Sequence, residues 1–164
     1  MLDDGAVVYE VEDRRLRNIT KTYTALVQSE PPPAFSPTVN VGSSYFKDQL
    51  GEGWFGLEGE HRWSKGHAVV YLGGPSSPDQ KLYVSGHAAE IELVAGALHL
   101  SLSIDGRPQP VQTVSGTEFD FTYNIPRDLV GRDKVEIAFT LDRTTRPPAD
   151  GRDLGLAFGE FNIR

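Results

Sequence analysis

From residue 38 onward, the chain consists of short runs in which apolar and polar residues alternate. Glycine, proline, aspartate or serine bounds each run, and these residues favour turns. Alternation with period two is typical of strands that bury one side and expose the other. The predicted strands are residues 38–46, 67–72, 81–88, 98–104, 110–115, 118–125, 134–141 and 154–163. Because no long helical segment separates them to make parallel crossovers, the pattern indicates an all-β, antiparallel sandwich or barrel.

Two connections between these runs carry specific turn signals. The sequence IDGRP, residues 104–108, places Asp105 and Gly106 between alternating runs, and both residue types accept a positive φ. We therefore predict a β-hairpin there. In IPRDLVGRD, residues 125–133, Pro126 suits the start of a helix and Gly131 its end, which predicts one helical turn.

The first 37 residues have a different character. Apolar residues recur mostly every three or four positions over residues 8–27, which favours an amphipathic helix over residues 10–17. Residues 19–27 are rich in β-branched side chains and fit either a helix or a strand. The prolines of EPPPAFSP, residues 30–37, remove backbone donors and predict a stiff linker. We expect an N-terminal helical or extended segment with this Pro-rich linker over residues 1–37, and a β-sandwich domain over residues 38–164.

Length, charge and cysteine content limit the classes of function. A chain of 164 residues suits one such domain, and its formal net charge of -7 works against binding to nucleic-acid backbones. It contains no cysteine, which excludes disulfide-stapled scaffolds and thiolate sites. The apolar runs are far shorter than the ~20 residues of a membrane-spanning helix, and the acidic start does not resemble a signal peptide. We expect a soluble, cytoplasmic protein with no nucleic-acid partner.

Residues 53–63, GWFGLEGEHRW, contain both tryptophans of the chain together with acidic and basic side chains. A pyranose ring presents apolar C–H faces that pack on an indole, and charged side chains hydrogen-bond its hydroxyls. The stretch therefore predicts a carbohydrate-binding site. Trp54 is expected to stack on the sugar and Trp63 to support it from beneath. Glu58 and Arg62 are expected to bond hydroxyls or to shape the loop.

The same stretch has a purely architectural interpretation. In this alternative, Trp63 fills the core of the sandwich, and Arg62 pairs with Glu58 or with an acid near residue 153. Gly53 and Gly56 either allow a ligand close to the backbone or serve a tight turn.

Five phrases of the sequence belong together: GWFGLEGEHRW, HAVVYL, LSIDGRP, FDFTYNIPRDLVGRDKVEIAFTLD and RDLGLAFGEFNIR, which span residues 53–164. Their motifs are a Gly-Trp, a nearby acid, an Arg-Trp and a late Arg-x-Leu-Gly. These motifs comprise Gly53, Trp54, Glu58, Arg62, Trp63, Arg152, Leu154 and Gly155. In this combination the chain resembles a bacterial β-sandwich domain found attached to glycosyltransferases, methyltransferases and other proteins of surface-polysaccharide synthesis. The resemblance implies a jelly-roll-like fold similar to a carbohydrate-binding module, non-catalytic recognition of a carbohydrate or glycan precursor, and a glycosyltransferase partner.

No motif for catalysis or metal binding stands out. The histidines lack the short spacing of zinc ligands. They are His61, His67, His87 and His99. A structural calcium ion stays open, since loop carbonyls and scattered acids can supply oxygen ligands. The acids considered are Asp48, Asp79, Asp142 and Asp150. The serines lack a nucleophile elbow, and a glycosidase carboxylate pair cannot be recognised without distances. We therefore predict no transition-metal site, no cofactor other than such a calcium ion, and no enzymatic activity.

The polar connection over residues 142–155 contains three arginines. Loops at one end of a sandwich often carry function, so Arg143 and Arg146 stay open to a binding or a structural role. For Arg152 and Asp153 we expect a solvated turn that Arg152 anchors to a carboxylate or a backbone carbonyl.

A protein-interaction or assembly module is the second functional interpretation. The apolar stripe of the N-terminal segment either docks on the sandwich or pairs with another copy in a homo-oligomer, because so short a helix is marginal unless it buries that face. An exposed sheet offers another docking surface. The exposure of Trp54 distinguishes the two interpretations. An indole flat on the surface beside polar groups favours sugar, and an indole under the loop with an apolar patch elsewhere favours protein contact.

Overall fold

The computed structural model describes residues 9–12, 15–18 and 35–164. The chain divides into two compact units, Met1–Pro33 and Ala34–Arg164. The first contains a pair of short strands, and the second contains all the other described elements. In the described part of the chain, no helix has the length and apolar character needed to cross a bilayer.

The two strands of the first unit form an antiparallel hairpin. They are β1 (Tyr9–Glu12) and β2 (Arg15–Asn18). The helix predicted over residues 10–17 is therefore wrong for these segments. Their residues also alternate with period two, and the register pairs acidic positions with basic ones, such as Glu10 with Arg17, as suits a hairpin. The predictions for residues 19–27 and for most of the linker lie outside the described residues.

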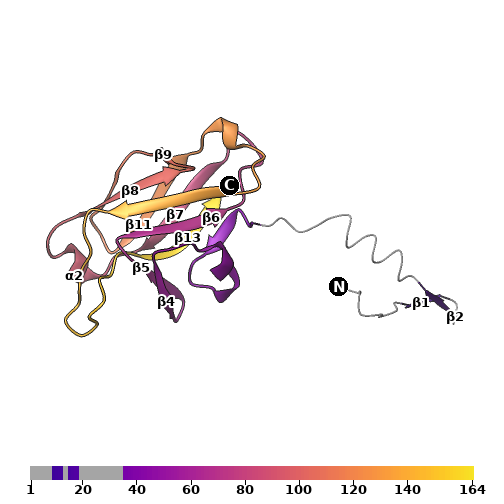
Figure 1. Cartoon of the computed structure of the whole chain (residues 1–164), viewed down its shortest axis with the longest axis horizontal. Coiled ribbons are helices and arrows are strands. Elements are labelled where there is room, and N and C mark those ends of the chain that lie inside the picture. Colours follow the sequence, from indigo (N-terminus) through magenta and orange to yellow (C-terminus); the bar gives the residue numbers. More distant parts are fainter. Residues whose placement is uncertain (1–8, 13–14, 19–34) are drawn as a thin grey trace. The chain divides into compact units, whose positions relative to one another are not determined.

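The second unit is built from two antiparallel sheets, whose strands are coloured along the sequence in Figure 1. The five-stranded sheet has the order β10-β8-β12-β6, with β9 paired to β8. Its strands are β6 (His67–Leu72), β8 (Leu98–Ile104), β9 (Arg107–Pro108), β10 (Gln112–Val114) and β12 (Val135–Leu141). The six-stranded sheet has the order β11-β7-β13-β5-β4, with β3 paired to β13. Its strands are β3 (Thr38–Asn40), β4 (Trp54–Glu58), β5 (His61–Ser64), β7 (Lys81–His87), β11 (Glu118–Asn124) and β13 (Ala157–Ile163).

Alternate residues of the two sheets point inward and form one apolar core. In β12, Ile137 and Phe139 are almost completely buried, whereas Ala138 between them is partly exposed. Aromatic rings lie at the centre: the ring centroid of Phe158 is 4.3 Å from that of Phe139 and 5.2 Å from that of Phe161. Burial of this apolar surface is the main source of stability. The predicted all-β, antiparallel sandwich is confirmed.

Every predicted run contains a strand, so these eight strands are confirmed. The first run is shorter than predicted, because β3 ends at Asn40 and residues Ser44–Gln49 form a 3-10 helix, η1. The side chain of Ser43 caps that helix by accepting a hydrogen bond from the backbone N–H of Tyr45 (3.2 Å). Strands β4, β5 and β9 lie outside the predicted runs. For β4 and β5 the reason is that GWFGLEGEHRW shows no clean alternation of apolar and polar residues.

Both predicted turns are confirmed. Asp105 and Gly106 have φ values of 50° and 78° and join β8 to β9. The Asp105 carboxylate also accepts a hydrogen bond from the backbone N–H of Glu136 (3.0 Å). The helical turn is the 3-10 helix η2 (Arg127–Leu129), with Pro126 before it and Gly131, at φ 81°, after it. One further short helix, α2 (Glu90–Leu93), precedes β8.

Candidate functional site

The stretch GWFGLEGEHRW forms a hairpin of the six-stranded sheet. Strands β4 and β5 pair antiparallel, and Gly59, at φ 62°, lies in the tight turn between them. Arg62 holds the hairpin in place. Its Nη1 donates to the carbonyl of Phe55 (2.9 Å), and its Nε donates to the carbonyl of Val41 (3.3 Å). Arg62 therefore shapes the hairpin through backbone carbonyls rather than by pairing with Glu58.

Gly53 allows this hairpin to approach β6. Its φ is 88°, and a Cβ atom there would lie 2.0 Å from the carbonyl oxygen of His67. We expect Gly53→Ala to lower the free energy of unfolding by at least about 2 kcal/mol, because the methyl group meets backbone in a conformation that L-residues rarely adopt. Gly56→Ala is the control, since a Cβ there has no neighbour within 4 Å, and it should change stability by less than about 0.5 kcal/mol. Equal midpoints of urea unfolding for the two variants would contradict this role of Gly53.

Trp54 lies beneath the hairpin, against the core. Its indole N–H donates to the carbonyl of Val69 (2.7 Å), and its ring meets those of Phe139 and Phe158 edge-on at centroid distances of 5.7 and 5.8 Å. This placement reverses the expected arrangement, in which Trp54 is exposed and Trp63 lies underneath. The physical reason is the direction of the side chain at the start of β4, which points to the interior of the sandwich.

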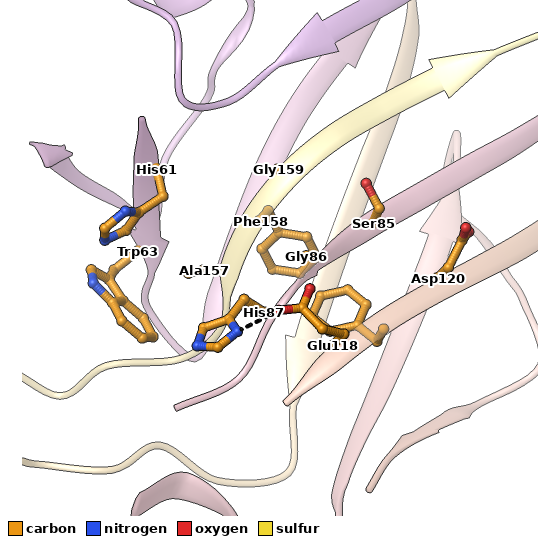
Figure 2. A pocket seen from close by; sticks show the side chains of 11 residues that line it. His61, Trp63, Ser85, Gly86, His87, Glu118, Asp120, Ala157, Phe158 and Gly159 are labelled. Atoms are coloured by element: carbon orange, nitrogen blue, oxygen red, sulfur yellow. Dashed lines mark hydrogen bonds and ion pairs between the residues drawn. The ribbon is translucent and has the colours of Figure 1, made fainter. Parts of the chain in front are cut away.

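Trp63 and His61 lie on the outer face of the six-stranded sheet (Figure 2). Side chains alternate along β5, so Ser64 is buried while Trp63 is half-buried and His61 is exposed. The imidazole of His61 meets the indole of Trp63 at 89°, with 5.9 Å between ring centroids. Together they form an aromatic wall on this face.

Strand pairing places Trp63 in a row with residues of three other strands. Trp63 of β5 pairs with Ala157 of β13. Ala157 pairs in turn with His87 of β7, and His87 with Glu118 of β11. Paired strands are about 4.8 Å apart, so the backbone positions at the ends of the row are about 14 Å apart. The indole and the carboxylate therefore stand at opposite ends, with a methyl group and an imidazole between them.

A second row, two positions further along the strands, completes a depression in this face. Ser85 of β7 pairs with Asp120 of β11. On the other side, β13 carries a bulge at Gly159. Ala157 and Gly159 form the floor, and the volume of the depression is about 740 Å³. We call it the outer-face depression; besides Gly86, Phe119 and Phe158, the residues that line it are His61, Trp63, Ser85, His87, Glu118, Asp120 and the two floor residues.

Several polar groups of the outer-face depression have no partner within residues 9–12, 15–18 and 35–164. Nδ1 of His87 lies 3.1 Å from Oε1 of Glu118, the contact dashed in Figure 2. The side chains of His61, Ser85 and Asp120 lie at the depression and form no hydrogen bond or ion pair with other residues that the structure describes. Their donors and acceptors are therefore available to a ligand.

Glu58 and Arg152 form an ion pair away from this depression. Nη1 of Arg152 donates to Oε1 of Glu58 (2.5 Å), and Nε donates to Oδ1 of Asp150 (2.5 Å). The guanidinium also lies over the ring of Phe55, 5.1 Å from its centroid. The hydrogen bonds from Arg152 hold the pKa of the Asp150 carboxyl below its usual range. The expected anchoring of the loop by Arg152 is confirmed.

The other arginines of residues 142–155 have structural contacts. Arg146 donates two hydrogen bonds to the carboxylate of Asp153, of 2.9 and 2.8 Å. Arg143 donates to the backbone carbonyls of Ala97 (2.7 Å) and Glu92 (3.0 Å), at the end of α2. The loop of residues 142–155, drawn in gold, accordingly extends beside α2 in Figure 1. These contacts indicate that Arg143 and Arg146 hold the loop rather than line the outer-face depression.

Glu92 of α2 is a buried acid that no sequence motif indicates. The residue is 2% exposed, and its Oε2 accepts a hydrogen bond from the backbone N–H of Ala89 (2.7 Å). Its Oε1 has no hydrogen-bond partner among the residues that the structure describes. Burial raises the pKa of Glu92 to about 7, although the hydrogen bond from Ala89 acts to lower it. Glu92 therefore titrates near neutral pH in the folded protein.

The described ranges 9–12, 15–18 and 35–164 contain no group of three or more histidine, cysteine or acidic side chains placed to hold a metal ion. Among the acids considered for calcium, Asp142 accepts hydrogen bonds from the backbone N–H and the imidazole of His99 (3.0 and 2.8 Å). The backbone hydrogen bond from His99 lowers the pKa of Asp142. Asp150 is bonded to Arg152, as described above.

Of the four residues predicted for the site, Trp63 alone lines the outer-face depression. Trp54, Glu58 and Arg62 belong to the same hairpin but do not line the depression. Of the other polar lining residues, His61 belongs to the same stretch, whereas Ser85, His87, Glu118 and Asp120 lie outside it, on β7 and β11. Their signal in the sequence is a polar residue at the outward positions of two predicted strands, but only the strand pairing shows that these positions adjoin Trp63.

No family model matches the chain, and no curated protein matches its sequence. Several solved structures are similar to it. One is a 4-O-methyl-α-glucuronidase of family GH115 with specificity for decorated arabinogalactans, at 11% identity and a TM-score of 0.48; the match covers 77% of this chain and 17% of that one. Another is a carbohydrate-binding module CBM36 in complex with calcium and xylotriose, at 13% identity and a TM-score of 0.47, covering 77% of this chain and 98% of the module. A family 35 carbohydrate-binding module from an environmental isolate is similar over 82% of this chain and 89% of that one, at 9% identity and a TM-score of 0.43.

Proposed function

We propose that the second unit is a non-catalytic carbohydrate-recognition module that binds a sugar in the outer-face depression. The observation that carries this proposal is the row of Trp63, Ala157, His87 and Glu118. It sets an indole and hydrogen-bonding groups on either side of a floor of small side chains. A sugar has apolar C–H faces and many hydroxyls, so a site for it needs both kinds of contact.

Each part of the depression has a role in this proposal. The indole of Trp63 packs on the C–H face of a pyranose ring, and the small side chains at Ala157 and Gly159 leave room for that ring. The carboxylates of Glu118 and Asp120 accept hydrogen bonds from sugar hydroxyls. These bonds are specific because a ligand without hydroxyls would leave the desolvated carboxylates without partners.

The residues predicted from the sequence keep a place in the proposal. Trp54 packs the hairpin onto the core, Arg62 fixes its backbone, and Glu58 is held by Arg152 at its flank. These contacts fix the position of Trp63 before a sugar arrives. A pre-organised aromatic side chain loses less conformational entropy on binding.

We further propose that this recognition supports bacterial surface-polysaccharide synthesis in the cytoplasm. In this role the module binds a carbohydrate or glycan precursor for a glycosyltransferase partner and does no chemistry itself. The resemblance of the Gly-Trp, Arg-Trp and Arg-x-Leu-Gly motifs supports this part of the proposal.

Glycan binding by the wild type and by Trp63→Ala tests the proposal. Both proteins are screened against a broad glycan array and against the surface polysaccharide of the producing cell, and bound glycans are titrated by calorimetry. We expect Trp63→Ala to weaken binding by at least about tenfold, because an aromatic side chain that packs on a sugar ring contributes ~1.4 kcal/mol or more. Gly159→Leu should have a similar effect by filling the floor. A Cβ atom there has Ser85 as its nearest neighbour, at 3.7 Å, so the fold should tolerate it.

Tyr71→Ala is the matched control. Tyr71 is a half-buried aromatic residue on β6, in the other sheet, and we expect the variant to bind glycans as the wild type does. Circular dichroism shows whether each variant is folded. A wild type that binds no glycan would overturn the proposal and favour a protein-interaction module. Loss of binding in Tyr71→Ala with normal binding in Trp63→Ala would move the site to the five-stranded sheet.

A further inference from the structure

We infer that the outer-face depression selects glycans that carry an unsubstituted, positively charged amino sugar and excludes acidic glycans. The inference rests on the proposed function and deepens it, because it names the chemical class of the ligand. It follows from three features of the depression. These are the sign of its charges, the unused hydrogen-bond acceptor positions of its carboxylates, and the aromatic wall opposite them.

The permanent charges that line the depression are all negative. Glu118 and Asp120 are two positions apart on β11, so both carboxylates lie on the outer face. Among the lining residues, all of which the structure describes, there is no lysine or arginine. An acidic sugar in this depression would therefore meet two carboxylates and no permanent cation.

These two carboxylates keep most of their hydrogen-bonding capacity. One oxygen of Glu118 contacts Nδ1 of His87 at 3.1 Å, and 82% of the Glu118 side chain is exposed. The Asp120 carboxylate has no ion pair with any residue of the described ranges. Asp128 differs, because both its oxygens accept 2.5 Å hydrogen bonds from Arg107. Glu118 and Asp120 present carboxylates like that of Asp128, but no arginine is among the residues that line the depression.

An ammonium group supplies the missing cation. It donates three hydrogen bonds, and charge-assisted hydrogen bonds are about twice as strong as neutral ones. N-acetylation removes the charge and leaves a single N–H donor, so it should cost the ligand most of this contribution. The indole of Trp63 adds to the selection, because the face of an aromatic ring also attracts cations.

The length of the row favours an oligosaccharide. The aromatic wall is on β5 and the carboxylates are on β11, and strands β13 and β7 lie between them. One sugar ring packs on Trp63 while the ammonium group of a neighbouring ring lies at Glu118 and Asp120. Ala157 contributes only a methyl group to the floor, so the path along the row is open between Trp63 and the imidazole of His87.

Calorimetry with matched oligosaccharides tests this inference. The probes are glucosamine oligosaccharides with free amines, the same oligosaccharides after N-acetylation, and oligogalacturonate, together with the free-amine and N-acetylated forms of every array glycan that binds. At a pH where the amines are protonated, we expect the free-amine form to bind at least about tenfold more tightly than the N-acetylated form, and oligogalacturonate to bind weakest. In the double variant Glu118→Gln, Asp120→Asn this preference should fall to about twofold or less, because the free-amine form loses more affinity than the N-acetylated form does.

A second double variant separates local recognition from the attraction of a cation to an acidic protein. Asp133→Asn with Glu136→Gln makes the same change in net charge, on and beside β12 of the other sheet, and should retain the preference for amines. The inference is overturned if N-acetylated or acidic oligosaccharides bind as tightly as free amines, or if both double variants lose the preference equally. In those cases binding that depends on Trp63 would still support carbohydrate recognition. Absence of binding to every glycan would overturn the proposed function as well.

Discussion

Trp54→Ala is expected to lower the free energy of unfolding by about 3 kcal/mol, at the low end of the range for removal of a large aromatic side chain from a core, because Trp54 is partly buried and packs against the core. The indole packs against the rings of Phe139, Phe158 and Phe161, which are almost completely buried, so its removal uncovers these core rings. The change also leaves the carbonyl of Val69 without its indole donor. Urea unfolding followed by circular dichroism measures the loss.

Trp63→Ala is the natural comparison, because the second indole is also half-buried but lies on the outer face, away from the core rings. Its removal should cost less than about 1.5 kcal/mol of stability and leave a folded protein that has lost glycan binding. The pair of variants thus separates the fold from the binding site. If Trp54→Ala unfolded at the urea concentration of the wild type and also lost glycan binding, Trp54 would be the contact residue and the placement of the two indoles would be contradicted.

Glu92→Gln is expected to remove a pH dependence of stability that amounts to about 3 kcal/mol between pH 4.5 and pH 7. The pKa of Glu92 has its ordinary value of 4.5 in the unfolded chain, and burial raises it to about 7 in the folded protein. Between these values the folded protein keeps a proton that the unfolded chain has lost. The wild type therefore loses stability as the pH rises through this window and levels off above it, and the variant does not.

Glu90→Gln is the control for this prediction, because Glu90 lies on the same short helix with its side chain exposed. The measurement is urea unfolding of the three proteins below, within and above the window. The carboxyls with a lowered pKa, such as Asp142 and Asp150, act in the opposite direction: their contribution is lost as the pH falls below the ordinary range of an aspartate. A difference between wild type and Glu92→Gln that stays constant from pH 4.5 to pH 7 would show that Glu92 does not titrate in this window.

Local patterns were sufficient to predict eight of the eleven strands of the sandwich. Alternation along a run depends only on that run, and the turn at Asp105 and Gly106 needs only two residues that accept a positive φ. The N-terminal segment shows the limit of this approach. Spacing of three or four residues favours a helix, yet the same residues also alternate over the two short stretches that form β1 and β2. Two periods coexist there, and pairing between the strands decides between them.

The candidate site could be predicted only in part. The stretch that contains Trp63 was recognisable because it combines aromatic and charged residues. Which indole points outward was not, because a register shift in the hairpin between Trp54 and Leu57 sets the direction of each side chain. The acidic end of the depression depends on pairing among β5, β13, β7 and β11, which are far apart in the sequence. Glu118 and Asp120 therefore become neighbours of the site only through the sheet.

NMR of isotope-labelled protein with a bound glycan tests the central claim most directly. The chain has two tryptophans, so it has two indole N–H signals, which the variants Trp54→Phe and Trp63→Phe assign. If the outer-face depression recognises the sugar, titration shifts the Trp63 indole signal and the backbone amides of Ala157, His87 and Glu118, while amides of β6 and β12 stay in place. Shifts confined to the five-stranded sheet or to the loop of residues 142–155, with an unchanged Trp63 signal, would contradict the assignment of the binding site.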